Sequence, residues 1–282
     1  ARRPAQGLRS IIFSPDETWL LRDAPAARRA YLDDVIRACE PSFGALLRDY
    51  ERTLAQRNRF LIDKTLVRSE IVQQLPHWDD GLLSWGSRIS LLRSVWIEKL
   101  AVHLPQLYAG FAPSDSAARL SYLPFYGSES FSTEAKIAER FAELLLQRRD
   151  EEIERRITLV GPHRDDWEIG LGEGKARRHA SQGQHRTLVL SLKLAELKLR
   201  EEETHDRPVL LLDDVTSELD EQRLQRLLDH LCEIKAQTFL TTTERGVFPD
   251  RVLKAATTLL FSLPQLTVAG TSSTGKAASM RG

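Results

Sequence analysis

The sequence has little cysteine, no excess charge of either sign and no long apolar run. Its 282 residues carry 40 lysines and arginines against 40 aspartates and glutamates, so the formal net charge is zero. That balance excludes a uniformly basic nucleic-acid-binding chain, although a local basic patch is compatible with it. No run approaches the ~18 apolar residues of a membrane span, and no signal-peptide pattern opens the chain. We therefore expect neither a membrane protein nor an exported one.

The chain contains only two cysteines and one methionine. Cys39 and Cys232 lie far apart and lack the spacing of metal ligands, so we expect two packing thiols in a reducing, cytoplasmic compartment. Met280 lies near the carboxyl end, so the sequence does not begin at an initiator methionine. We therefore expect part of a longer protein.

What the sequence does contain predicts a globular protein of roughly two domains, at ~150 residues each. Apolar residues recur at three- and four-residue steps over stretches that we expect to be helices, at residues 26–39, 43–75, 85–108 and 133–156. Pro105 is expected to kink or end the third of these. Residues 110–132 are rich in serine, proline and glycine and predict a loop with short strands.

Short apolar runs alternate with helical patterns in the rest of the chain, which predicts a parallel sheet. We expect strands at residues 10–13, 157–160, 166–171, 208–212 and 238–242. We expect one helix to open at residues 14–16 and two others to cover residues 184–203 and 221–235. Residues 259–262 and 266–268 are expected to form a hairpin. The fold class is therefore α/β, a lobe with a parallel or mixed sheet and an inserted helical domain. The lobe comprises residues 1–40 and 157–268, the helical domain 41–156, and a disordered tail 269–282.

The strongest chemical motif is a pair of acids, Asp213 and Asp214, directly after the apolar run 209–212. A parallel strand that ends in acids places carboxylates at the sheet edge where α/β folds bind ligands. There Asp213 can hold Mg²⁺, and Asp214 can orient or deprotonate a water that attacks a phosphate. The alternative is a buried strand that ends in two solvated acids.

A second motif, Ser181-Gln182-Gly183-Gln184, stands just before an expected helix. A hydroxyl, a glycine amide and a helix amino end together form an anion site. The alternative is an ordinary helix cap with a turn glycine. Residues 174–195 contain no aspartate or glutamate but include the basic residues Lys175, Arg177 and Arg178. This local positive charge suits a polyanionic partner.

Residues 161–166 form a third block, Gly-Pro-His-Arg-Asp-Asp. His163 and Arg164 are candidate contacts to a nucleotide or DNA, and the alternative is a turn with a local ion pair. Exposed basic residues could also touch phosphates, or simply be solvated, among them Arg57, Arg59, Arg177 and Arg178. If they bind DNA, its affinity falls steeply with salt.

One segment near the carboxyl end looks like a phosphate-binding loop but does not match the full pattern. Residues 270–277 nearly fit the pattern G-x-x-x-x-G-K-[ST], but Ala277 lacks the hydroxyl that would ligate Mg²⁺. The residues that follow are too few for the helix whose amino end should face the phosphates.

The acids, with Ser217 and Asp220 just after them, resemble the Walker B and D-loop block of ABC-type ATPases, and residues 181–184 resemble their signature. Further segments, at residues 13–16, 28–33, 50–58 and 161–166, extend the likeness over nearly the whole chain. Together the motifs resemble the RecF family, bacterial DNA-repair ATPases of the ABC/SMC class.

This resemblance implies an ATP-dependent DNA-binding protein of replication, recombinational repair and the SOS response. It would bind single-strand/double-strand DNA gaps, form an ATP-dependent homodimer, and promote RecA loading with RecO and RecR. ATP and Mg²⁺ are the implied cofactors. Asp213 would serve the metal, Asp214 would be the catalytic carboxylate, and residues 181–184 and Asp220 would face the partner subunit or its nucleotide.

One contrast with ABC transporters and one departure from the family pattern matter. Threonines 241–243 stand where ABC transporters place a histidine, which suggests slow, switch-like hydrolysis. The family's amino-terminal phosphate-binding loop is absent, so we expect weak Mg-ATP binding in calorimetry and no hydrolysis by this chain alone. A non-enzymatic DNA- or partner-binding module, and a two-metal nuclease built on residues 165–166 and 213–214, are the competing interpretations.

Overall fold

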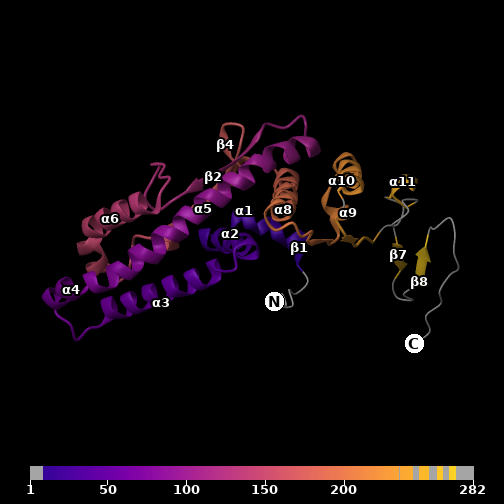
Figure 1. Ribbon diagram of the computed structural model, residues 1–282. Helices are drawn as coiled ribbons and strands as arrows, with labels where there is room; N and C mark the ends of the chain where they lie inside the picture. Colours follow the sequence, from indigo (N-terminus) through magenta and orange to yellow (C-terminus); the bar gives the residue numbers. More distant parts are fainter. Residues whose placement is uncertain (1–8, 235, 244–247, 254–258, 263–266, 271–282) are drawn as a thin grey trace.

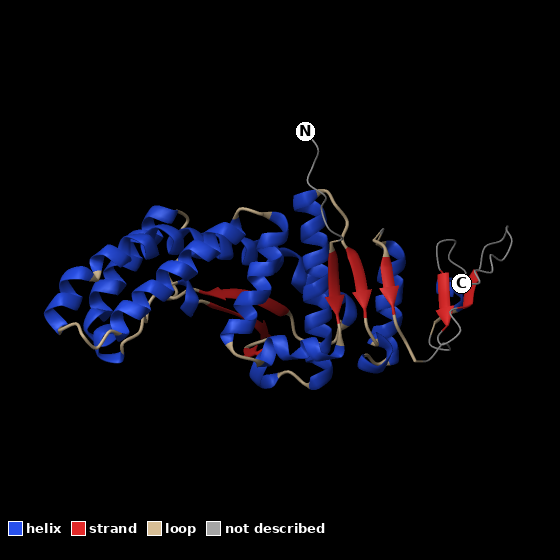
Figure 2. Ribbon diagram, turned by 90° about the horizontal axis from the view of Figure 1, so that it is seen from below, coloured by secondary structure: helices blue, strands red, loops and turns tan. Residues whose placement is uncertain are grey.

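The computed structural model describes residues 9–234, 236–243, 248–253, 259–262 and 267–270 (Figure 1). An arm of long helices lies at one side and a small parallel sheet lies nearer the carboxyl-terminal side (Figure 2). The large core cluster runs through both regions, and a smaller one formed by Leu61, Ile71, Leu75 and Ile153 lies in the arm.

The parallel sheet has the order β1-β5-β6, from β1 (Ser10–Phe13), β5 (Val209–Leu212) and β6 (Thr238–Leu240). The three strands predicted here are confirmed. One face is buried, where Phe13, Leu210 and Leu212 are at most 1% exposed. On the opposite face the register aligns Ile12, Leu211 and Phe239. Ile12 and Phe239 remain 48% and 51% exposed, which is unusual because parallel sheets are normally covered on both faces.

A second sheet is antiparallel, in the order β2-β3-β4, from β2 (Ala118–Leu123), β3 (Asp166–Leu171) and β4 (Gly174–Lys175). It confirms the predicted strand 166–171. The strand predicted at 157–160 is wrong. The amide of Thr158 donates to Asn58 Oδ1 (2.8 Å) and that of Leu159 to Glu152 Oε1 (2.7 Å), so side chains take the bonds that a neighbouring strand would make.

The helical arm contains α3 (Phe43–Ile62), α4 (Arg68–Gln74), α5 (Pro76–Phe111) and α6 (Glu134–Arg155). One helix over residues 43–75 is therefore wrong. After α3, Asp63 Oδ1 accepts from both the amide and the hydroxyl of Thr65, a turn that ends the helix.

Helix α5 begins at Pro76, earlier than predicted, because proline suits the first turn of a helix. It also continues through Pro105, where we expected a kink or an end. Leu100, Leu104 and Tyr108 are buried on both sides of the proline, so packing holds the helix across the missing hydrogen bond. Helix α5 packs on α3 and α6 and also on β2 and α8. The predicted division into domains at residues 40 and 156 stays a prediction.

The remaining helices connect these layers. They are η1 (Pro15–Thr18), α1 (Trp19–Arg22), α2 (Pro25–Cys39), η2 (Pro162–Arg164), α7 (Ala176–His179), α8 (Gln182–Thr204), α9 (Val215–Glu218), α10 (Glu221–Glu233) and α11 (Asp250–Leu253). The predicted hairpin is confirmed as β7 (Leu259–Ser262) paired with β8 (Thr267–Gly270). Of the predicted tail, residues 271–282 lie outside the described residues. Among the described helices, none is long and apolar enough to cross a membrane.

Candidate functional site

The two acids lie where the strand pattern predicted, at the carboxyl end of β5. Thr241, just after the neighbouring strand β6, holds them both. Its hydroxyl donates to Asp213 Oδ1 (2.6 Å) and accepts from the amide of Asp214 (2.9 Å). Thr241 thus stabilises the loop that carries the acids. The sequence pattern singled out threonines 241–243 only as a missing histidine.

Asp214 adopts an unusual conformation at this edge. Its φ of 46° places it in the left-handed region, which aspartate tolerates better than most residues. One carboxylate oxygen, Oδ2, accepts from the Ser217 hydroxyl (2.7 Å). The other, Oδ1, is buried and has no hydrogen-bond partner. A buried carboxylate oxygen without a donor is costly, and it fits a cation or an ordered water. The pair Asp213 and Asp214 therefore fits Mg²⁺ held directly or through water.

The predicted signature turn is exposed and opens α8. Ser181 Oγ accepts from the amide of Gln184 (3.2 Å), and Gln184 Oε1 accepts from the amide of Ser181 (2.9 Å). This reciprocal capping box confirms the helix cap of the alternative, whereas the turn glycine of that alternative is wrong, because Gly183 lies within α8. The cap does not remove the anion-binding potential, because the amino end of a 23-residue helix faces solvent here.

Asp220 caps α10 in the same way, since its Oδ1 accepts from the amide of Arg223 (2.9 Å). Arg223 also reaches the signature turn, because its guanidinium lies 3.7 Å from Asp115, which accepts from Gln184 Nε2 (3.2 Å). Asp115 and Arg223 were not predicted from the sequence. No local pattern could have shown that they meet, since Asp115, Gln184 and Arg223 lie far apart along the chain.

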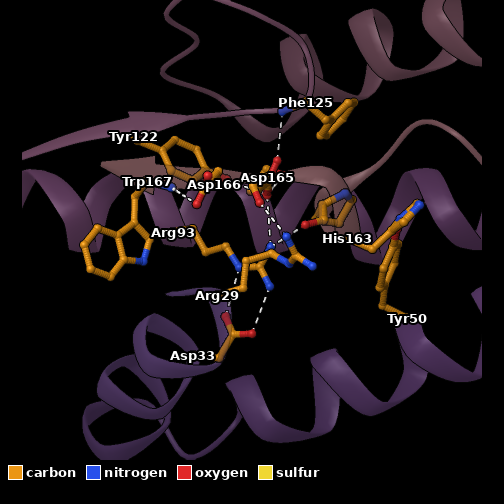
Figure 3. Close-up of polar contacts among 12 residues, drawn as sticks. Arg29, Asp33, Tyr50, Arg93, Tyr122, Phe125, His163, Asp165, Asp166 and Trp167 are labelled. Carbon is orange, nitrogen blue, oxygen red and sulfur yellow. Dashed lines mark hydrogen bonds and ion pairs between the residues drawn. The ribbon is translucent and has the colours of Figure 1, made fainter. Parts of the chain in front are cut away.

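The block 161–166 is largely buried, apart from the exposed Arg164, and cross-links the fold (Figure 3). Asp165 is fully buried, and its Oδ2 accepts from Arg93 (3.0 Å), Ser90 (3.1 Å) and Tyr122 (2.6 Å). Arg93 also forms a two-pronged pair with Asp33, at 2.9 Å for both bonds. Burial alone would lower the pKa of Arg93, but Asp33 and Asp165 outweigh burial and raise it, so the guanidinium stays charged.

The local ion pair considered for this block is wrong. Asp166 pairs with Arg28 of α2, at 2.7 and 2.8 Å. Arg164, although exposed, donates to the Thr158 carbonyl oxygen (2.9 Å) and not to a neighbouring acid. The acids of this block therefore join helices that are distant in the sequence.

His163 uses both ring nitrogens inside the protein. A carbonyl oxygen can only accept, so Nε2 donates to Thr158 O (3.2 Å), and Nδ1 accepts from the Tyr50 hydroxyl (2.6 Å). Burial lowers the pKa of His163 to about 4, so the ring is neutral at pH 7. The geometry favours a structural role, and the predicted nucleotide or DNA contact of His163 and Arg164 stays a prediction.

This buried histidine predicts an acid-sensitive fold. Below pH 6.5 the unfolded chain protonates the imidazole while the folded chain resists until about pH 4, so stability is full above 6.5 and is lost as pH falls. The loss due to His163 should reach about 3 kcal/mol. Urea unfolding at pH 7 and pH 4.5 should show a smaller acid-induced loss for His163→Gln. An equal loss in both proteins would contradict this assignment.

The basic residues divide into two groups. Lys175, Arg177 and Arg178 are exposed on β4 and α7, with Lys175 paired to Glu168 (2.7 Å). Their contact to DNA or nucleotide stays a prediction. Arg57 is different, because its side chain is fully buried and donates to Asp79 (3.0 Å) and Glu152 (2.7 Å). The phosphate contact considered for Arg57 is therefore wrong.

The nuclease interpretation is also wrong for the part of the chain that the structure describes. Asp165 and Asp166 are committed to Arg93 and Arg28, in a separate network from Asp213 and Asp214. No group of three or more histidine, cysteine, aspartate or glutamate side chains among the described residues is arranged to hold a metal ion.

Comparison with known proteins identifies the family. No protein-family model matches the chain. Curated relatives called "DNA replication and repair protein RecF" include one from Nostoc punctiforme, 39% identical over 88% of this chain and 67% of its own. One from Moorella thermoacetica is 41% identical over 86% of this chain and 63% of its own. The chain spans 65% of the length of the relative from Acetivibrio thermocellus, with 35% identity.

Solved structures agree with these sequences. The "recombination mediator protein RecF-ATP in RecFOR pathway" superposes with a TM-score of 0.75 at 33% identity, over 84% of this chain and 63% of that one. A second structure, "RecF-ATPrS", gives 0.75 at 32% identity over 86% and 64%. The α/β class with an inserted helical arm is thus confirmed, and the chain belongs to the RecF family of DNA replication and repair proteins.

Proposed function

We propose that this chain is part of an ATP-dependent DNA-binding protein of replication and recombinational repair, in which the acid pair Asp213 and Asp214 and the signature turn form opposite halves of nucleotide sites that close when two subunits meet. The observation that carries the proposal is Asp214, which directly follows Asp213 at the carboxyl end of β5 and whose buried carboxylate oxygen Oδ1 has no hydrogen-bond partner. The relatives named as RecF, and the solved RecF-ATP structures, support ATP as the nucleotide.

In this proposal each motif has a separate task. Asp213 holds Mg²⁺, which when bound neutralises phosphate charge. Asp214 orients and deprotonates the attacking water, for which its left-handed backbone and its bond from Ser217 fix the carboxylate. The amino end of α8, with Ser181 and Gly183, binds the γ-phosphate presented by a second subunit. Asp220 contacts that subunit.

The DNA-related part of the proposal rests on charge and on the relatives' names. Arg177 and Arg178 are exposed next to the signature turn and suit a phosphate backbone. The solved structures place RecF in the RecFOR pathway. We propose that the whole protein acts with RecO and RecR at single-strand/double-strand DNA gaps to promote RecA loading.

The test is ATP-dependent association with a full-length relative. This chain is titrated against the RecF protein of Moorella thermoacetica with and without Mg-ATP, by fluorescence anisotropy. We expect binding that needs ATP, and at least about 10-fold weaker binding for Ser181→Arg, because a bulky group blocks the anion site. The control is Ser84→Arg, at an exposed position in α5.

Association that is equal with and without ATP would contradict the proposal. It would favour the non-enzymatic binding module, which needs the fold but not the nucleotide site.

A further inference from the structure

A partly buried ion pair joins the two turns that the proposed function assigns to the partner subunit. Asp115, in the loop after α5, and Arg223, in the first turn of α10, have side chains only 16% and 19% exposed. Their closest approach is 3.7 Å. The pair of Asp115 and Arg223 is separate from Asp213 and Asp214 at the carboxyl end of β5. It is also separate from the cross-linking network around Asp165.

On one side, the pair holds the signature turn. Gln184 uses both ends of its amide, since Oε1 accepts from Ser181 and Nε2 donates to Asp115 Oδ2 (3.2 Å). The same oxygen of Asp115 accepts from the Tyr108 hydroxyl (2.6 Å). Burial and the bond to Asp115 raise the pKa of Tyr108, so it stays a hydroxyl donor. The bond from Tyr108 therefore fixes the position of the Asp115 carboxylate that Gln184 contacts.

On the other side, the pair holds the turn at Asp220. Arg223 Nε lies 3.3 Å from Asp220 Oδ2, while its own amide donates to Asp220 Oδ1 (2.9 Å). The guanidinium also lies against the signature turn, because a Cβ at Gly183 would come within 3.1 Å of Arg223 Nη1. One arginine therefore contacts both turns.

We propose that Asp115 and Arg223 are positioning residues that hold the signature turn and the Asp220 turn at a fixed spacing. A guanidinium suits this task, because it is always charged and its several N–H groups can face two carboxylates at once, here Asp115 at 3.7 Å and Asp220 at 3.3 Å. The inference rests on the proposed function, in which both turns meet the partner's nucleotide and must arrive together. Neither Asp115 nor Arg223 needs to touch the nucleotide.

The first test uses this chain alone and measures amide exchange at Gln184 and His185. These amides are protected by Ser181, through its hydroxyl (3.2 Å) and its carbonyl oxygen (2.9 Å). We expect Arg223→Gln and Asp115→Ala each to speed exchange at both amides by about 10-fold, because the turn loses its outside support. Arg223→Lys should restore part of the protection, and the double variant should exchange no faster than Arg223→Gln alone.

The control is Arg226→Gln, one turn further along α10. Arg226 donates to the Phe111 carbonyl oxygen (2.9 Å) and not to the signature turn. It should destabilise the same helix yet leave exchange at Gln184 and His185 within about 2-fold of wild type. Unchanged exchange in Arg223→Gln, or equal acceleration by both variants, would overturn the proposal.

The second measurement separates this proposal from the function on which it rests. In the association titration, Arg223→Gln should weaken ATP-dependent binding by about 10-fold, with a Tm no lower than that of Arg226→Gln. If wild-type chain shows no ATP-dependent binding, the proposed function fails while amide exchange still decides whether the two turns are coupled. If binding is ATP-dependent but Arg223→Gln binds like wild type, the positioning role itself fails.

Discussion

Replacing Arg93 with methionine is expected to lower the free energy of unfolding by about 3–5 kcal/mol, because it leaves two buried carboxylates without their counter-ion. Arg93 is 4% exposed, and its partners Asp33 and Asp165 are 7% and 0% exposed. The arginine also donates to the Pro162 carbonyl oxygen (2.6 Å), which would lose its donor. Urea unfolding at pH 7 measures the change.

A matched control lies on the same helix. Arg88 is exposed on α5, so Arg88→Met should change the free energy of unfolding by less than about 0.5 kcal/mol. If the Arg93 and Arg88 variants unfolded at the same urea concentration, the network around Asp165 would contribute nothing to stability. A loss of cooperativity in Arg93→Met alone would still fit, because its partners join α2, α5 and the block 161–166.

Substituting Gly161 with alanine is the second change with a large expected effect, about 2–5 kcal/mol, from backbone strain and overpacking together. Gly161 has a φ of 133°, a region that residues with a Cβ rarely adopt. A Cβ there would also lie 2.5 Å from the Tyr50 hydroxyl oxygen and 3.0 Å from Phe141 Cζ. The clash would displace the hydroxyl that donates to His163.

Gly110 provides the opposite case. It lies in α5, and a Cβ added there would meet no atom within 4 Å, so Gly110→Ala should stabilise the protein by up to about 1 kcal/mol. Thermal unfolding of the two variants should therefore shift Tm in opposite directions. A lower Tm for both would mean that helix propensity does not operate at this end of α5.

Local patterns were enough to predict the elements that carry the two acids and the signature turn. The apolar run before Asp213 predicted β5, and the spacing of Ser181 and Gln184 predicted a helix start. Both signals act within a few residues, where sequence neighbours are spatial neighbours. The parallel pairing of β1 with β5 followed from the alternation of strands and helices.

The cross-linking network could not be predicted in the same way. Asp165 pairs with Arg93, 72 residues away, and Asp166 with Arg28, 138 residues away. A chain with 40 residues of each charge offers many possible pairs, and only the tertiary fold selects among them. The burial of Arg57 could not be predicted for the same reason. Its position in a helix does not show that Asp79 and Glu152 enclose its side chain.

The open face of the parallel sheet affects how the protein behaves in concentrated solution. Ile12 and Phe239 present apolar surface to water, and the sequence pI of about 7.3 leaves almost no electrostatic repulsion near neutral pH. Colloidal attraction is therefore strongest under the buffers most often chosen for DNA-binding assays, and sulfate or phosphate strengthens it further. Working a pH unit or more above neutrality, in chloride, restores repulsion and keeps the histidine at position 163 neutral.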